Sequence, residues 1–302
     1  MVHKLESLLT LLALVLVVAY VGAAVSATYL QMNRQIGVVQ IVGPIYSFSE
    51  LTDQIGGAED DPRVKAVVFY LNSPGGGASA CMEIRRYVEN MTKANIAIMD
   101  EVAASGAYYI GSAADEILAH GNTMTGSIGV ISVWEDYSKW LENEGIAFHV
   151  WKSGQAKDLY EPWRSPTAEE NETIQREIDR IYEILVADIA RGRPNMTIED
   201  VRSVANGSVY TGLEALEKGL IDEIGDYTQA VRKVASRVKV SRYIARDMSL
   251  GDREVLADLF LAYVTSEVTV FIVGSLVLIG VIRMSLRRRE GRERERIRAS
   301  GM

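Results

Sequence analysis

Cysteine and histidine are scarce in this chain of 302 residues, which has one cysteine and three histidines. The single cysteine, Cys81, excludes an intrachain disulfide and any metal site built from several cysteines. Its place after a glycine-rich turn indicates a small buried side chain rather than a reactive thiol. Only His120 and His149 lie in the body of the chain, and neither stands in a segment typical of a catalytic loop. With no P-loop or metal-ligand cluster either, the sequence predicts a site without metal or other cofactor.

Positive charge is also scarce, except at the C-terminus. The net charge is −8, and residues 283–302 contribute +5 from eight arginines and three glutamates, so the rest of the chain carries −13. An acidic body argues against nucleic acid as a partner. The basic tail can contact anionic lipid headgroups, although a solvated tail whose arginines only fix topology is the simpler explanation.

Two apolar segments near the ends of the chain predict membrane spans. Residues 7–32 contain no charge, and residues 268–282 form a second run that extends to residue 263 if Glu267 lies in the membrane interface. A spanning helix needs about 20 mostly apolar residues, which the first run exceeds and the second reaches only with that extension. The arginines after residue 282 mark the cytoplasmic side, so we expect the body of the chain outside the cytoplasm.

These features predict an integral protein of the cell membrane with five parts. Val25-Ser26-Ala27 resembles the end of a cleavable signal peptide, but the apolar run continues past it, which favours an uncleaved anchor. The expected parts are an N-terminal transmembrane anchor (1–32), an extracytoplasmic domain (33–245), a juxtamembrane linker (246–262), a transmembrane helix (263–282) and an Arg-rich cytoplasmic tail (283–302).

Strand and helix patterns alternate through the body, which predicts an α/β fold. Residues 64–71 are almost continuously apolar, as in a buried strand. A capping-box pattern at Thr167–Glu170 starts a long helix whose isoleucine-rich stripe is expected to pack on the core. Other strands are expected at 36–42, 96–99, 116–119 and 147–151, and other helices at 49–55, 78–91, 106–114 and 211–219.

Three short segments carry candidate catalytic groups. Residues 72–77 read Asn-Ser-Pro-Gly-Gly-Gly, residues 103–106 read Ala-Ala-Ser-Gly, and Lys157 lies in Lys-Ser-Gly-Gln-Ala-Lys-Asp. A serine hydroxyl needs a group that accepts its proton, and a neutral lysine can replace histidine in that role. Ser105 is expected where a strand turns into a helix, beside free N–H groups. Each segment alone is weak evidence, since small residues also suit helix packing and most lysines are solvated.

The order of four motifs is more specific than any one of them. After the glycine-rich turn come Ala-Ala-Ser-Gly-Ala-Tyr-Tyr-Ile, then Thr-Gly-Ser-Ile-Gly-Val, then Lys-Ser-Gly-x-x-Lys-Asp. With these motifs, the chain resembles the signal peptide peptidase A family of membrane serine proteases over about residues 36–238. It looks like the short, single-unit form of that family. The second apolar segment and the Arg-rich tail depart from the family's usual single anchor.

The resemblance implies a ClpP/crotonase-like fold, here flanked by two transmembrane helices. It implies Ser105 as the nucleophile and Lys157 as the general base. Gly76 and Gly106 would supply the N–H groups of an oxyanion hole, and Ser127 would orient the lysine. It also implies a ring-like homo-oligomer, in which the lysine that serves one serine can come from a neighbouring subunit.

The predicted function is therefore that of a membrane-anchored Ser-Lys endopeptidase. Its expected substrates are apolar peptides such as residual signal peptides, cleaved outside the cytoplasm. One alternative is a protease dedicated to a single membrane protein. A crotonase-type acyl-CoA enzyme is a second alternative, but it needs no Ser-Lys pair and finds no ready acyl-CoA outside the cytoplasm. A non-catalytic membrane scaffold is a third, and the intact pair of residues argues against it.

Overall fold

The computed structural model describes residues 11, 14–16, 18–20, 22, 34–241, 243–250, 280, 284 and 288. Contacts divide the chain into two units, one of residues 36–241 and the other of residues 1–35 together with 242–302. The expected spans at 1–32 and 263–282, the linker and the tail lie mostly or wholly outside the described residues. None of the helices within the described residues combines the length and the apolar character that crossing a bilayer requires.

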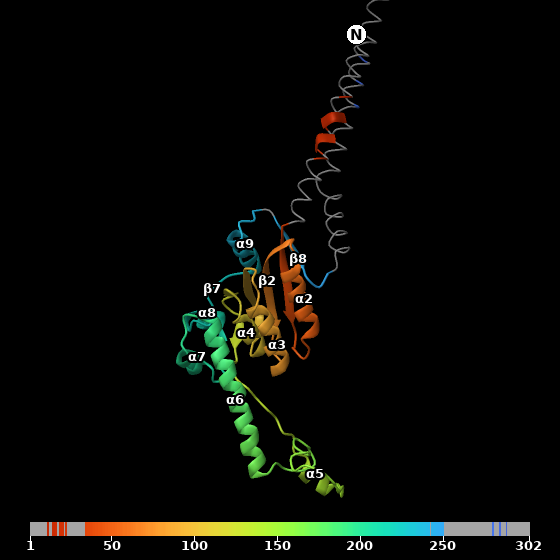
Figure 1. Cartoon of the computed structure of the whole chain (residues 1–302), viewed down its shortest axis with the longest axis vertical. Helices are drawn as coiled ribbons and strands as arrows, with labels where there is room; N and C mark the ends of the chain where they lie inside the picture. Colours follow the sequence, from red (N-terminus) through yellow and green to blue (C-terminus); the bar gives the residue numbers. More distant parts are fainter. Residues whose placement is uncertain are drawn as a thin grey trace, which may run out of the picture. The chain divides into compact units, whose positions relative to one another are not determined.

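A mostly parallel β-sheet forms the centre of the unit of residues 36–241 (Figure 1). Its main strand order is β6-β5-β3-β2-β1, with β4 paired to β3 and β7 paired to β4. The β2–β3, β3–β4, β3–β5 and β4–β7 pairs are parallel, and the β5–β6 pair is antiparallel. The strands are β1 (Gln35–Val42), β2 (Val64–Ser73), β3 (Asn95–Ala104), β4 (Ile117–Ala119), β5 (Met124–Gly126), β6 (Val209–Thr211) and β7 (Glu223–Ile224).

Helices cover the sheet, as the continuous apolar pattern of its central strands requires. Most side chains of β2 and β3 are buried, which is expected when both faces of a strand are covered. Helices α4 and α9 contact both central strands, α2 contacts β2, and α3 packs on α4. The prediction of an α/β fold is confirmed. The helices are α2 (Ser49–Asp60), α3 (Ala78–Glu89), α4 (Gly106–Gly111) and α9 (Tyr227–Arg237).

The long helix α6 (Ala168–Gly192) begins where the sequence predicts. The Thr167 side chain accepts a hydrogen bond from the Glu170 N–H, and the Glu170 carboxylate accepts one from the Thr167 N–H. The prediction that its apolar stripe packs on the core is wrong for most of the helix, because only Val186 and Ile189 are buried. The reason is that α6 extends beyond the sheet, with its C-terminal end against α7 (Figure 1). Helix α7 is Ile198–Val204, and α8, which follows, is Gly212–Glu217.

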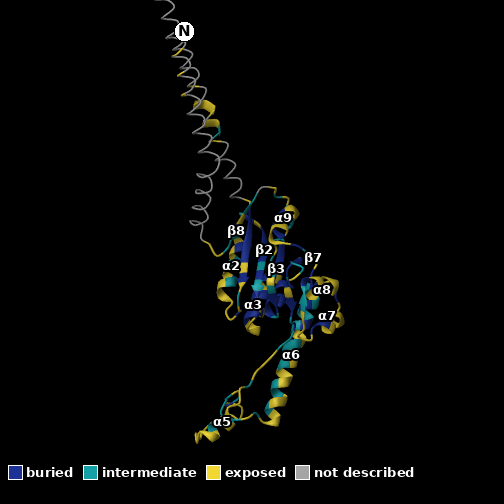
Figure 2. Cartoon of the chain, turned by 180° about the vertical axis from the view of Figure 1, so that it is seen from behind, coloured by how far each residue is buried: buried dark blue, intermediate teal, exposed yellow. Residues whose placement is uncertain are grey.

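Residues 131–167, which we call the outer lobe, connect β5 to α6 and contain α5 (Ser138–Asn143). The strand expected at residues 147–151 is not formed, because these residues are exposed and pair with no other strand in the described part of the chain. Figure 2 shows mainly buried residues in the sheet and mainly exposed ones in the outer lobe. All four tryptophans of the chain lie in this lobe, at positions 134, 140, 151 and 163.

The other unit contributes one described strand, β8 (Ile244–Asp247). The N–H of Ile244 donates to the carbonyl of Arg34 at 3.3 Å. A side-chain hydrogen bond of 3.2 Å joins Arg246 Nη1 to Gln35 Oε1. These contacts link the segment after residue 242 to Arg34 and Gln35 within the same unit.

Candidate active site

Ser105 lies at the sharp turn between β3 and α4. Its φ of 54° and ψ of −120° are unusual for a residue with a side chain, and such strain is concentrated at functional sites. The Ser105 N–H donates to the carbonyl of Gly126 on β5 at 2.8 Å, and its own carbonyl accepts from the Tyr109 N–H at 2.9 Å. The sheet and the helix thus hold Ser105 from both sides. The expected strand-to-helix turn is present at this residue.

The glycine-rich turn after β2 leaves one backbone N–H free beside this serine. The Gly75 N–H donates to Ser73 Oγ at 3.1 Å. The Gly77 N–H donates to the carbonyl of Ile45 at 2.8 Å. The Gly76 N–H between them makes no hydrogen bond with any described residue. Hydrogen bonds of Gly75 and Gly77 therefore hold the turn, and the Gly76 N–H between them stays available as a donor.

Gly106 brings a second available donor to the same place. A Cβ at Gly106 would lie 3.3 Å from the Gly76 nitrogen and 2.3 Å from Cys81 Sγ, so only glycine permits this approach. The Gly106 N–H is the first of α4 and has no partner within the described part of the chain, as expected in a first helical turn. Two neighbouring free N–H groups can stabilise an oxyanion. The geometry therefore fits the predicted roles of Gly76 and Gly106.

Cys81 packs behind these glycines as a buried side chain. It is 2% exposed. Burial raises the pKa of its thiol to about 11, so the thiol stays protonated at neutral pH. Its position agrees with the sequence-based expectation of a small packed residue, and its sulfur limits the space at Gly106.

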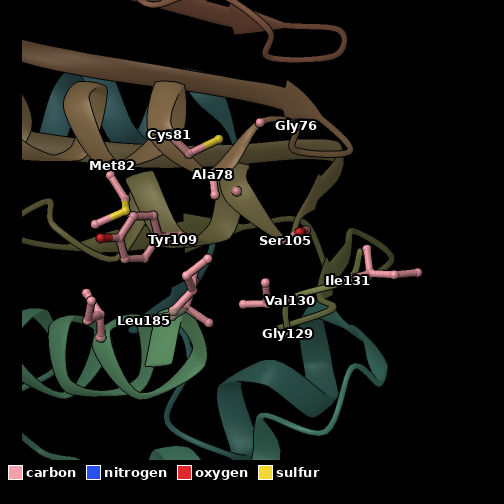
Figure 3. Close-up of a pocket in the computed structure, with 14 residues that line it drawn as sticks. Gly76, Ala78, Cys81, Met82, Ser105, Tyr109, Gly129, Val130, Ile131 and Leu185 are labelled. Carbon is pink, nitrogen blue, oxygen red and sulfur yellow. The ribbon is translucent and has the colours of Figure 1, made fainter. Parts of the chain in front are cut away.

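A pocket of about 220 Å³ opens next to Ser105 (Figure 3). In Figure 3, Ser105 and Gly76 lie at one end, while Met82 and Leu185 lie towards the other. Most of its walls are apolar side chains, which suits an apolar group of a ligand. Sequence reasoning did not assign these residues to a pocket, although two of them, Ile181 and Leu185, belong to the predicted apolar stripe of α6. The apolar walls come from α3 (Cys81, Met82), α4 (Tyr109), the segment after β5 (Val130, Ile131) and α6 (Ile181, Ile184, Leu185).

Ser127 lies beside Ser105 where two parallel strands end. Ala104 of β3 is paired with Gly126 of β5, so the two serines are the next residues along neighbouring strands. Ser127 also has a positive φ, of 47°, and its N–H donates to the carbonyl of Ser208 at 2.7 Å. Ser105, Ser127 and the two glycine N–H groups thus lie together at the carboxyl ends of the parallel strands.

Lys157 does not join this group within one chain. It is exposed on the outer lobe, and it is not part of the lining of the Ser105 pocket. Its neighbours Ala156 and Asp158 face a different pocket, shared with Thr173 of α6. Thr173 and Ile181, the first residue of α6 that lines the Ser105 pocket, are separated by about 12 Å along the helix at the usual helical rise. One copy of the chain therefore keeps the predicted nucleophile and base apart.

The two body histidines also lie outside the Ser105 pocket. His120 Nε2 is 3.5 Å from Asp100 Oδ1, and the exposed His149 lies next to Trp151 on the outer lobe. In the described residues, no group of three or more His, Cys, Asp or Glu side chains could hold a metal ion. Neither histidine is therefore placed to accept the proton of Ser105.

Comparison with known proteins decides the family. Residues 89–241, about half of the chain, match the family model of Peptidase family S49. The chain belongs to this family. The match includes Ser105, Ser127 and Lys157, and the resemblance to the signal peptide peptidase A family is confirmed.

Relatives from distant organisms carry related names. The "Putative signal peptide peptidase SppA" of Enterococcus faecium is 37% identical over 199 residues, which cover 65% of this chain and 58% of that protein. "Protease 4" of Haemophilus influenzae is 34% identical over 219 residues, which cover 68% of this chain and 35% of that protein. The "Serine protease SPPA, chloroplastic" of Arabidopsis thaliana is 31% identical over 203 residues, which cover 66% of this chain and 30% of that protein. The chain thus spans between about a third and somewhat over half of the length of these relatives.

Proposed function

We propose that this chain is a serine endopeptidase whose nucleophile is Ser105. The observation that carries the proposal is the strained serine beside the free N–H groups of Gly76 and Gly106, at the mouth of an apolar pocket. Attack of Ser105 Oγ on a peptide carbonyl would place the developing oxyanion near these two donors. Collapse of that intermediate releases the amine and leaves an acyl-enzyme, which water then hydrolyses.

Lys157 is the general base of this proposal, and it serves the Ser105 of a neighbouring copy. The separation of the two residues within one chain supports this arrangement. The outer lobe also exposes large apolar side chains that a neighbouring copy could cover, including Ile131 at 84% and Trp151 at 89% exposure. Burial between two copies would favour the neutral amine, which can accept the serine proton. Ser127, beside Ser105, orients that amine.

The substrates in this proposal are apolar, signal-peptide-like peptides. Support comes from the apolar walls of the Ser105 pocket and from the relative named "Putative signal peptide peptidase SppA". The rest of the proposal has its support in the sequence. Residues 1–32 and 263–282 anchor a ClpP/crotonase-like domain outside the cytoplasm, with the tail 283–302 inside and in reach of membrane lipid.

A serine-directed fluorophosphonate probe tests the nucleophile and the base together. We expect labelling of the wild-type chain and no labelling of Ser105→Ala or Lys157→Ala, in detergent-solubilised protein of equal oligomer size. Equal labelling of all three proteins would contradict the proposal. Absence of labelling in a folded and assembled wild-type chain would instead favour the non-catalytic scaffold.

Mixing two inactive variants tests whether the base comes from another copy. Ser105→Ala and Lys157→Ala chains, carrying tags of different size, are unfolded and reassembled together. A mixed assembly places an intact Lys157 next to an intact Ser105, so labelling should return on the Lys157→Ala chain alone. A mixture that stays unlabelled, although it contains both chains, would show that the lysine acts within its own chain.

A further inference from the structure

One arginine of the outer lobe holds the Lys157 loop through several hydrogen bonds. Arg164 Nε and Nη2 donate to the two carboxylate oxygens of Asp158, the residue after Lys157, at 3.1 and 3.0 Å. Arg164 Nη2 also donates to the Asp158 carbonyl oxygen at 2.8 Å. The guanidinium therefore fixes both the side chain and the backbone next to the lysine. Such paired, charge-assisted hydrogen bonds constrain geometry far more than a single ion pair does.

The same guanidinium is bound to the start of α6. Arg164 Nη1 and Nη2 donate to the two carboxylate oxygens of Glu170 at 2.8 and 2.7 Å. Glu170 also caps the helix, because its carboxylate accepts from the Thr167 N–H at 2.8 Å. The loop that carries Lys157 is therefore linked to the most regular element near it, the first turn of α6.

Two further residues, Trp134 and Lys152, also contact Arg164 and Asp158. The Arg164 guanidinium lies over the ring of Trp134, 5.1 Å from its centre, and the Arg164 carbonyl accepts from Trp134 Nε1 at 3.2 Å. The ammonium of Lys152 donates to Asp158 at 2.5 Å. Asp158 is buried although its chain neighbours on the N-terminal side are exposed. The lobe has little regular structure, so these side-chain contacts, together with the hydrogen bonds within the loop, are what orders it.

We infer that Arg164 is the positioning residue for Lys157: it fixes the loop of residues 152–158 on α6, so that the amine points in one direction towards the serine that it serves. The inference rests on the proposed role of Lys157 as the base. A base that is misplaced by about 1 Å can lose about 100-fold in rate, so the order of this loop matters for turnover. The apolar pocket at Ser105 is formed by other residues, so substrate binding should be affected much less.

The test compares four variants of the full-length, detergent-solubilised chain. Arg164→Met removes the network, and Arg164→Lys keeps the charge without the paired hydrogen bonds. Glu170→Gln loses the ion pair but keeps a residue that completes a capping box. Arg202→Met is the matched control, because Arg202 makes a similar paired contact to Glu183 of α6 at 2.6 and 2.8 Å but binds nothing in the loop.

Two readouts are measured on each variant: hydrogen exchange of residues 152–160, and kcat and KM on a fluorogenic apolar peptide. For Arg164→Met we expect roughly tenfold faster exchange in the loop, a kcat lower by about 10 to 100-fold, and a KM within about twofold of wild type. Arg164→Lys and Glu170→Gln should fall between Arg164→Met and the wild type in both readouts. Arg202→Met should match the wild type.

Faster exchange with an unchanged kcat would overturn the inference, and so would a lower kcat with unchanged exchange. A loss in Arg202→Met equal to that in Arg164→Met would also overturn it. If Arg164→Met does not assemble, the two milder variants carry the same test. Failure of the proposed function is recognised separately, because Lys157→Ala would then react like the wild type. Normal dependence on Lys157 together with an unaffected Arg164→Met would overturn this inference alone.

Discussion

The Ser105 pocket and the Lys157 loop belong to the same chain but are held by different forces. Ser105 is fixed by strand pairing, by a buried helix and by glycine contacts that leave no room for a Cβ. The loop that carries Lys157 is held by hydrogen bonds from the charged side chains of Lys152 and Arg164 to Asp158. Close packing holds the first group rigid in every copy. A polar network holds the second, and most residues of this loop stay exposed.

Removal of the nucleophile should have the greatest effect on activity. Ser105→Ala should lower peptide hydrolysis by about 10⁴-fold or more, because the oxyanion donors alone give only a small residual rate. The measurement is the turnover of a fluorogenic apolar peptide, with Ser203→Ala on α7 as the control. Residual activity above about 1% of wild type would show that another residue is the nucleophile.

Filling the space at Gly106 should cause the next largest loss. In Gly106→Ala the new Cβ would lie 2.3 Å from Cys81 Sγ and 3.3 Å from the Gly76 nitrogen. We expect about a 100 to 1000-fold lower kcat, as for a lost oxyanion donor, and destabilisation by about 1–3 kcal/mol from overpacking.

The double variant Gly106→Ala/Cys81→Ala separates the two effects. Removal of the sulfur should restore most of the stability in urea unfolding, while kcat stays low because the contact at Gly76 remains. Full recovery of kcat in the double variant would show that the sulfur contact, rather than the N–H groups, limits the rate.

A buried arginine, Arg85, tests how strongly internal contacts stabilise the region around Ser105. Arg85 is 1% exposed and donates to the carbonyls of Tyr109 and Asp188 and to Ser112 Oγ at 2.6, 2.5 and 2.7 Å. It thus joins α3 to α4 and α6. Arg85→Met should lower the free energy of unfolding by about 2–4 kcal/mol, because buried acceptors lose their donor.

The neighbouring Arg86 provides the control for this variant. It is exposed, and within the described part of the chain its side chain has one ionic contact, of 3.6 Å with Glu83. Arg86→Met should therefore change the free energy of unfolding by less than about 0.5 kcal/mol in the same urea titration. Similar losses in the two variants would show that the buried contacts of Arg85 are not what holds α4.

The smallest expected effect is on the lobe side and depends on pH. Hydrogen bonds from Arg164 are the main cause that lowers the pKa of Asp158 to about 2, and they lower the pKa of Glu170 to about 2 as well. Both values lie below those of an unfolded chain, so the stabilisation is complete above about pH 4.5 and is lost as the pH falls towards 2. Pepsin should cut the outer lobe faster at pH 2 than at pH 4.

This proteolysis experiment needs two reference measurements. An unfolded peptide corrects for the pH dependence of pepsin, and Arg164→Met should be cut readily at both pH values because it already lacks the network. A wild-type lobe that is cut equally at pH 4 and pH 2, after this correction, would show that the two carboxylates do not hold it.

The core elements were predictable because their signals are local. The apolar run of β2 and the small residues around Ser105 indicated a buried strand and a sharp turn, and both are present. The approach of Gly76 to Gly106 could be expected only through the family resemblance, since the two segments are brought together by strand pairing.

Other features depend on contacts that the sequence does not display. The short strands β5, β6, β7 and β8 and the helices α5, α7 and α9 were missed, and α6 was expected to be buried along its whole apolar stripe. An apolar stripe looks the same whether it faces a core, a pocket or another copy. The setting of Lys157 was compatible with partial burial, yet the residue is exposed in the single chain.

The distribution of tryptophan has an optical consequence. All four indoles lie in the outer lobe, and the sheet has none. Excitation near 295 nm therefore reports on the lobe alone, without any introduced dye. Trp151 is 89% exposed, so it should emit at long wavelength and be quenched by acrylamide in a dissociated chain. As the protein concentration is raised, a blue shift of the tryptophan emission together with weaker acrylamide quenching would show that another copy covers this lobe.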